Sequence, residues 1–179
     1  FLQFEGFEHY DLEAYAQQMQ KRVRKWTGMP VSIGLGPSKA LAKVANRVAK
    51  KFIDRTNGVY VIDSEERRIK ALKWLAIGDV WGIGHRHNKR LVLRNVHTAY
   101  DFTQLSDAWV RKEISIVGLR LKHDLLGKSS IPLEMVAAPK KAIATTRSFE
   151  SLIDDFQELR ERVSTFAGLC AEKLRKQNS

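Results

Sequence analysis

Cationic side chains recur at helical spacing along one short stretch of the sequence. The set comprises Lys39, Lys43, Arg47 and Lys50. A spacing of three or four residues places such side chains on one face of a helix. An apolar set with the same spacing comprises Leu41, Val44, Ala45, Val48 and Phe52. The row of cations suits a polyanion, although any amphipathic surface helix also carries charge opposite its apolar face.

A glycine-containing turn leads into this predicted helix. An apolar strand-like segment ends at Ile33, and Gly34, Gly36 and Pro37 follow it before Ser38. A serine hydroxyl commonly caps a helix start. Glycines let a ligand approach the backbone, and free N–H groups at a helix start favour anions. We therefore predict a strand, turn and helix that bind phosphate, although the spacing matches neither GxGxxG nor a P-loop.

A second stretch with possible chemistry covers residues 77–91, which read IGDVWGIGHRHNKRL. Gly82 and Gly84 flank Ile83, which is the pattern of a helix-hairpin-helix. In such a hairpin Ile83 points inward, and the N–H groups of the next helix start point toward a DNA phosphate. The cations around this point are His85, Arg86, Lys89 and Arg90. The pattern predicts DNA-phosphate binding that is independent of base sequence and sensitive to salt; the alternative is an ordinary turn between helices.

Other residues with reactive side chains give no site. His85 and His87 are two residues apart and so do not share a helix face, and we predict no metal site. Cys170 is the single cysteine, which excludes an internal disulfide, and its apolar helical surroundings predict a buried, unreactive thiol. The acids near the start of the chain are explained as helix-start residues. We predict neither a metal ligand nor a catalytic residue in this chain.

Composition and charge limit the possible classes of protein. The chain has 179 residues, of which 44% are apolar and 28% charged, as in an ordinary globular protein. The 31 Lys and Arg exceed the 20 Asp and Glu, which gives a net charge of +11. A protein this basic often meets a polyanion, and nucleic acid is the commonest large one. The sequence has no run of about 18 apolar residues, so we predict no membrane span.

The coarse pattern predicts an α+β fold. Residues 1–63 read as a partial α/β unit whose helices cover one face of a sheet. Its predicted elements are a strand over 1–7, a helix from Asp11 to Gly28, a strand over 30–36, the helix over 38–52 and a strand over 59–62. Residues 64–127 read as a small all-helical domain whose last long helix starts near Trp109, because apolar residues recur there at helical spacing.

The remaining sequence predicts a linker and a further small domain. Residues 128–140 contain two prolines and no strong periodicity, which is typical of a linker. Residues 141–149 read as a strand, and Asp155 is placed to cap a last helix. Residues 141–179 are therefore predicted to begin an α+β domain. Both ends of the sequence suggest a piece of a longer protein.

Taken together and in order, these motifs resemble the Y family of translesion DNA polymerases, in particular its bacterial polymerase V-type branch. The motifs are FLQFEGF, VSIGLGPSKALAKVANRVAKK, TNGVYVID, DVWGIGHRHNKRL and TTRSFE. The resemblance implies that residues 1–63 are the C-terminal part of the palm and 64–127 the thumb with its helix-hairpin-helix. Residues 141–179 would begin the little finger, which straddles template and primer.

The resemblance also implies roles for residues and partners. Lys50 corresponds to the lysine that contacts the nucleotide triphosphate, and Lys43 to another motif lysine. The family holds two magnesium ions on carboxylates expected before Phe1, so magnesium is expected in the intact parent and this piece alone is expected to be inactive. Expected partners are primer–template DNA, dNTP, a sliding clamp and polymerase accessory subunits, in the cytoplasm and nucleoid of a bacterium.

Two other hypotheses remain open. The first is a non-catalytic DNA-binding protein that uses the same helix-hairpin-helix, as in inactive relatives. The second is a regulatory anion-binding α/β protein, which leaves the thumb-like pattern unexplained. Salt titration of duplex binding separates the DNA-binding hypotheses from this last one, because phosphate contacts weaken steeply with salt.

Overall fold

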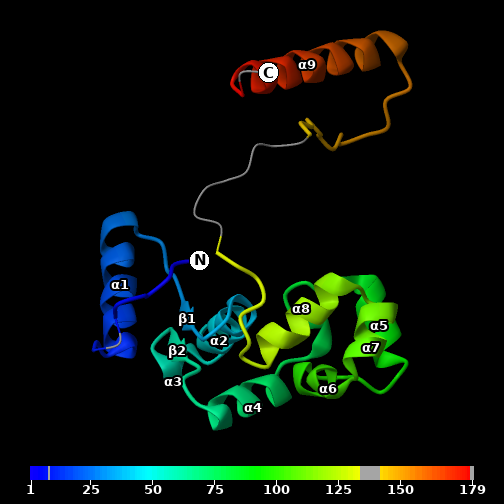
Figure 1. Ribbon diagram of the computed structural model, residues 1–179. Helices are drawn as coiled ribbons and strands as arrows, with labels where there is room; N and C mark the ends of the chain where they lie inside the picture. Colours follow the sequence, from blue (N-terminus) through cyan, green and yellow to red (C-terminus); the bar gives the residue numbers. More distant parts are fainter. Residues whose placement is uncertain (8, 134–141, 178–179) are drawn as a thin grey trace. The chain divides into compact units, whose positions relative to one another are not determined.

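The computed structural model describes residues 1–7, 9–133 and 142–177 (Figure 1). Contacts divide the chain into two units, Phe1–Leu133 and Glu134–Ser179, which are described separately. The first six residues of the predicted linker, 128–133, belong to the first unit, whereas 134–140 lie outside the described residues. The predicted boundary at residue 63 stays a prediction.

A two-stranded parallel sheet lies at the start of the first unit. Strand β1 (Ile33–Leu35) pairs with β2 (Val59–Val61), with Gly34 opposite Tyr60. The α+β class is confirmed in this form, a mostly helical chain with a small sheet. The strand predicted over residues 1–7 is wrong, because the described part of the chain offers this alternating segment no strand to pair with.

Helices cover both faces of this sheet. Helix α1 (Leu12–Thr27) packs through Ala16 against Leu35, Val59 and Val61. Helix α2 (Lys39–Lys51) packs on the opposite side, where Tyr60 joins its core. The prediction that the helices share one face is therefore wrong. Successive side chains of a strand point to opposite faces, so strands this short still support two helices.

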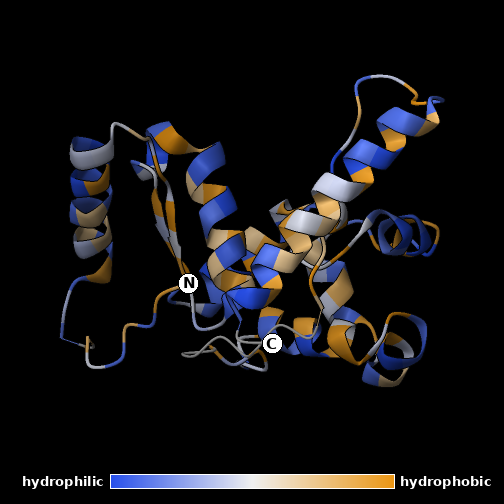
Figure 2. Cartoon of the chain, turned by 90° about the horizontal axis from the view of Figure 1, so that it is seen from above, coloured by the Kyte–Doolittle hydropathy of each residue, from blue (hydrophilic) through white to orange (hydrophobic). Residues whose placement is uncertain are grey.

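The predicted cap and apolar face of α2 are confirmed. The Ser38 hydroxyl accepts a hydrogen bond from the backbone N–H of Leu41 at 3.2 Å. The buried face consists of Ala40, Leu41, Val44, Ala45, Val48 and Ala49. In Figure 2 hydrophobic and hydrophilic residues alternate along the helices, as amphipathic helices require. Helix α3 (Ile53–Thr56) follows and leads into β2.

Short helices follow β2, as predicted. They are α4 (Glu65–Trp74), the 3-10 helix η1 (Ile77–Asp79), α5 (His85–Val92), α6 (Ala99–Gln104), α7 (Asp107–Glu113) and α8 (Ile116–Leu125). Their buried side chains, among them Leu72, Phe102 and Leu125, belong to the same core as the apolar face of α2.

The single long helix predicted from Trp109 onward is wrong, because the chain breaks at Ile114 and Ser115. Ser115 has an extended backbone, and its hydroxyl accepts a hydrogen bond from the N–H of Gly118. Because Ser115 caps α8, a new helix starts there, although the apolar residues keep the same helical spacing across the break. Val117 is exposed, so not every residue of this apolar pattern is buried.

An acid joins the two helices that this break produces. Hydrogen bonds from the Lys122 ammonium at 2.5 Å and the His123 ring at 3.0 Å hold the pKa of Asp107 below its ordinary value of 3.8. A carboxyl whose pKa is lowered by folding stabilises the fold above its unfolded pKa, and this contribution is lost as the pH falls through the folded pKa.

We therefore expect Asp107→Asn to lower the melting temperature above pH 3.8 and to have progressively less effect as the pH falls below it. Thermal unfolding of wild type and variant between neutral and acid pH measures this difference. A difference that stays constant with pH contradicts the assigned role of the carboxylate.

The second unit contains one long helix, α9 (Phe156–Arg175), capped by Asp155 as predicted. The predicted strand is wrong for 142–149, which have no regular structure, and Lys141 lies outside the described residues. Cys170 is only partly buried, and its thiol donates to the Thr145 hydroxyl at 3.2 Å, so the burial predicted for this thiol is wrong. Among the described helices, none has the length and apolar composition needed to cross a membrane.

Candidate phosphate-binding surface

The N-terminus of α2 is occupied by a carboxylate of the protein itself. Asp124 is 0% exposed, and its carboxylate accepts hydrogen bonds from the backbone N–H of Ala40 at 3.2 Å and of Ser130 at 2.7 Å. The Ser38 hydroxyl donates to the Asp124 carbonyl oxygen at 2.6 Å. The prediction of free N–H groups for a phosphate at this helix start is therefore wrong, because Asp124 already supplies the anion that such a terminus favours.

The glycine that precedes this turn serves packing. A Cβ on Gly34 would lie 1.9 Å from the backbone nitrogen of Asn46 and 2.5 Å from the carbonyl oxygen of Ala42. Only a residue without a side chain lets α2 lie this close to β1. Gly34 thus explains the strand–helix contact, and no ligand is needed to account for it.

The flank of α2 carries the predicted row of cations. The Lys39 ammonium donates to the Pro132 carbonyl oxygen at 2.7 Å, and Arg47 forms an ion pair with Asp79 at 2.5 Å. Lys43 and Lys50 are exposed, and within the described residues no carboxylate pairs with either of them. Within the described residues these two lysines, the predicted triphosphate contacts, are therefore the members of the row with neither an ion pair nor a hydrogen bond to a protein oxygen.

The predicted hairpin forms a tight turn with its apolar residue inward. Ile83 is 7% exposed, and its N–H donates to the Val80 carbonyl oxygen at 3.0 Å. Gly82 has a φ of 95°, a left-handed conformation that favours glycine. Gly84 precedes α5 without a side-chain cap, and no heavy atom lies within 4 Å of its Cβ position. The backbone at this helix start is thus accessible to an anion.

The cations after the hairpin differ in their partners. His85, Arg86 and Lys89 are exposed. Arg90 instead forms an ion pair with the Glu113 carboxylate at 2.5 Å and donates to the Glu113 carbonyl oxygen at 2.9 Å. Arg90 therefore joins α5 to α7, a role that its sequence neighbours did not indicate.

The two predicted phosphate sites adjoin in the structure. Asp79, which pairs with Arg47 of α2, lies in η1 directly before the hairpin. The ring of Phe1 lies 4.9 Å from the Lys43 ammonium and 5.7 Å from the Trp81 ring, measured to the ring centroids. We call the combined region the cation surface; it comprises Lys43, Arg47, Lys50, His85, Arg86, Lys89 and Arg90.

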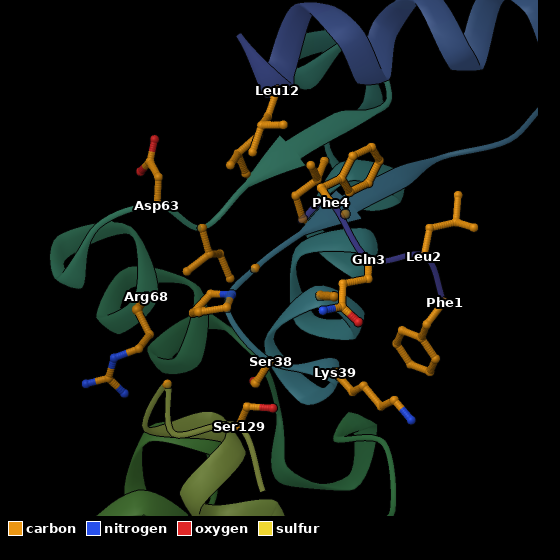
Figure 3. A pocket seen from close by; sticks show the side chains of 18 of the residues that line it. Phe1, Leu2, Gln3, Phe4, Leu12, Ser38, Lys39, Asp63, Arg68 and Ser129 are labelled. Atoms are coloured by element: carbon orange, nitrogen blue, oxygen red, sulfur yellow. The ribbon is translucent and has the colours of Figure 1, made fainter. Parts of the chain in front are cut away.

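A cavity of about 870 Å³, lined in part by Phe1 and Lys39, lies at the carboxyl ends of β1 and β2. Figure 3 shows Phe4 and Leu12 on its wall, with Ser38, Lys39 and Arg68 lining its other side. Arg68 pairs with Glu65 and donates to the Leu125 carbonyl oxygen. Because both of its cations have internal partners and most of its wall is apolar, this cavity is not assigned to phosphate.

The magnesium implied by the resemblance has no ligand set here. In the part of the chain that the structure describes, no group of three or more His, Cys, Asp or Glu side chains is arranged to hold a metal ion. We assign no magnesium ligand to these residues and derive no step through the ion.

Comparisons with known proteins identify relatives of this chain. Residues 1–47 match the impB/mucB/samB family. Protein UmuC of Salmonella typhimurium is 34% identical over 92% of this chain, and protein MucB of Escherichia coli is 32% identical over 92%. The chain belongs to the UmuC-type branch of the Y family. It spans about two fifths of these relatives, 39% of each.

More distant relatives extend the same family. DNA polymerase IV of Halobacterium salinarum is 22% identical over 92% of this chain, which covers 38% of that protein. The resemblance predicted from the five motifs is therefore confirmed at the level of the family. Palm, thumb and little-finger assignments and the roles of individual residues stay predictions.

Proposed function

We propose that this chain is part of an error-prone translesion DNA polymerase and that its cation surface binds phosphates. Lys50 and Lys43 would contact the triphosphate of the incoming nucleotide. Gly82, Ile83, Gly84, His85, Arg86, Lys89 and Arg90 would bind the DNA backbone. The proposal is carried by the Arg47–Asp79 ion pair, which joins the cation row of α2 to the hairpin, because the phosphates of the nucleotide and of the DNA would then meet one continuous surface.

The wider proposal follows the family. The whole protein would bind primer–template DNA and dNTP, use magnesium held by carboxylates elsewhere, and add nucleotides opposite damaged template bases. Residues 1–63 would be palm, 64–127 thumb and 141–179 the start of the little finger. Partners would include a sliding clamp and accessory subunits, in the cytoplasm of a bacterium at its nucleoid.

Phosphate binding at the hairpin is tested by the double change Arg86→Ala/Lys89→Ala. We expect this variant to bind duplex DNA more weakly whatever the base sequence. The slope of log affinity against log salt is expected to fall by about 2, since each phosphate contact contributes about 0.9. Fluorescence anisotropy with a labelled duplex at several salt concentrations measures both quantities.

Lys21→Ala/Arg22→Ala on α1 is the matched control, because these two exposed cations lie outside the cation surface. The control is expected to keep the wild-type salt slope. An unchanged slope in the hairpin variant, or an equal decrease in the control, contradicts the hairpin assignment. Primer extension by the whole protein then separates the polymerase from the non-catalytic DNA-binding alternative.

A further inference from the structure

Two exposed aromatic rings lie on the cation surface. Phe1 is 55% and Trp81 45% exposed, with the rings tilted by 54°. The Lys43 and Lys39 ammonium groups lie 4.9 Å and 5.5 Å from the centroid of the Phe1 ring. A cation at this distance from a ring face is attracted by the π electrons. Aromatic surface and positive charge therefore occur together at one place.

The fold does not need these rings as core. Trp74 is 39% exposed, but its ring lies 5.2 Å from that of Phe52, which packs against the main core. Trp81 lies in the hairpin between the buried Val80 and Ile83, so the backbone holds it at the surface while its neighbours anchor the turn. Large aromatic side chains with one face in water are typical of binding sites.

We propose that Phe1 and Trp81 form a stacking site for an unpaired nucleobase of single-stranded DNA, beside the positive charge of the cation surface. This inference rests on the proposed function, because it assumes that DNA reaches the cation surface. A ligand that satisfies both features needs a flat apolar face and a negative charge, and a nucleotide has both. Bases in a duplex are already stacked on each other, so the site adds affinity only for unpaired segments.

Aromatic stacking contributes enough to be measured. A base stacked on an aromatic side chain changes affinity by about five-fold or more. The backbone contacts of an oligonucleotide are independent of its bases. The stacking contribution is therefore the ratio of affinities for two strands of equal length and charge, one with bases and one without.

The experiment compares a labelled thymidine strand of about eight nucleotides with an abasic strand of the same length, by fluorescence anisotropy. We expect wild type to bind the thymidine strand about five-fold more tightly or better. In Trp81→Ala we expect the two strands to bind equally tightly. In Trp81→Phe we expect most of the preference for the thymidine strand to remain. Trp26→Ala is the control, because Trp26 is 75% exposed on α1, outside the surface. Duplex affinity should stay unchanged in Trp26→Ala, since Trp26 lies on α1, outside the cation surface.

Two results overturn the stacking site: equal affinity of wild type for both strands, or an unchanged ratio in Trp81→Ala. Loss of the ratio in Trp26→Ala also contradicts it. Failure of the proposed function gives a different result, in which Arg86→Ala/Lys89→Ala leaves duplex binding and its salt slope unchanged. The two failures are therefore distinguishable in one set of titrations.

Discussion

Replacing Gly34 by alanine is expected to lower the free energy of unfolding by about 3 kcal/mol or more. The new Cβ would lie 1.9 Å from the Asn46 backbone nitrogen and 2.5 Å from the Ala42 carbonyl oxygen. Both atoms belong to the backbone of α2, so no side-chain rotation relieves the overlap, and the helix has to move away from the strand. Urea unfolding followed by circular dichroism measures the loss.

Gly84→Ala is the matched control for this change. No heavy atom lies within 4 Å of its Cβ position, and its φ of −79° suits any residue. We expect Gly84→Ala to change the free energy of unfolding by less than about 1 kcal/mol. Equal stability losses at Gly34 and Gly84 would show that the close contact between α2 and β1 is not the cause.

Replacing Asp124 by alanine is expected to cost about 3 kcal/mol of stability, because buried backbone donors left without partners are expensive. The carboxylate is fully buried and accepts from the N–H groups of Ala40 and Ser130. The substitution removes both hydrogen bonds and an anion at the start of α2. Thermal or urea unfolding checks the value.

Asp124→Asn separates these contributions, since it keeps one acceptor oxygen and places an amide NH₂ where the other oxygen was. We expect an intermediate loss. Asp54→Ala is the control, because Asp54 is an exposed acid on α3, and a change of about 0.5 kcal/mol or less is expected there. An Asp124→Ala protein as stable as the control would exclude the carboxylate as a structural anchor.

Local signals in the sequence were sufficient to predict most helix starts. Ser38 and Asp155 each accept a hydrogen bond from the N–H three residues later, as their types and positions predicted. The strand after Asn57 and Gly58 was predicted from the sequence as well. Such features depend on a few neighbouring residues, which the sequence displays directly.

Features that depend on distant residues were not predictable in this way. The alternating segments at 1–7 and 142–149 lack the pairing that makes a strand, and pairing is a property of two segments. The break at Ser115 required knowing that its hydroxyl caps α8 while the apolar spacing continues.

The candidate surface was likewise predictable only where its features depend on neighbouring residues. The inward Ile83 and the left-handed Gly82 follow from the local hairpin pattern. The ion-pair partners of its cations do not follow from a local pattern, because Glu113 lies 23 residues after Arg90. Likewise Asp124 lies 84 residues after Ala40, whose N–H donates a hydrogen bond to its carboxylate. No local pattern indicated that an internal carboxylate fills the start of α2.

The core that α2 shares with the later helices has a mechanical consequence. Leu41 and Val44 pack in the same buried cluster as Leu72, Phe102 and Leu125. Sliding α2 past the later helices would open voids in this cluster, so we expect the cation row of α2 and the hairpin to move together. We therefore expect the span from Lys50 to Gly84 to stay the same when a ligand binds. A DNA strand that contacts both Lys50 and the hairpin would have to match the length of this span.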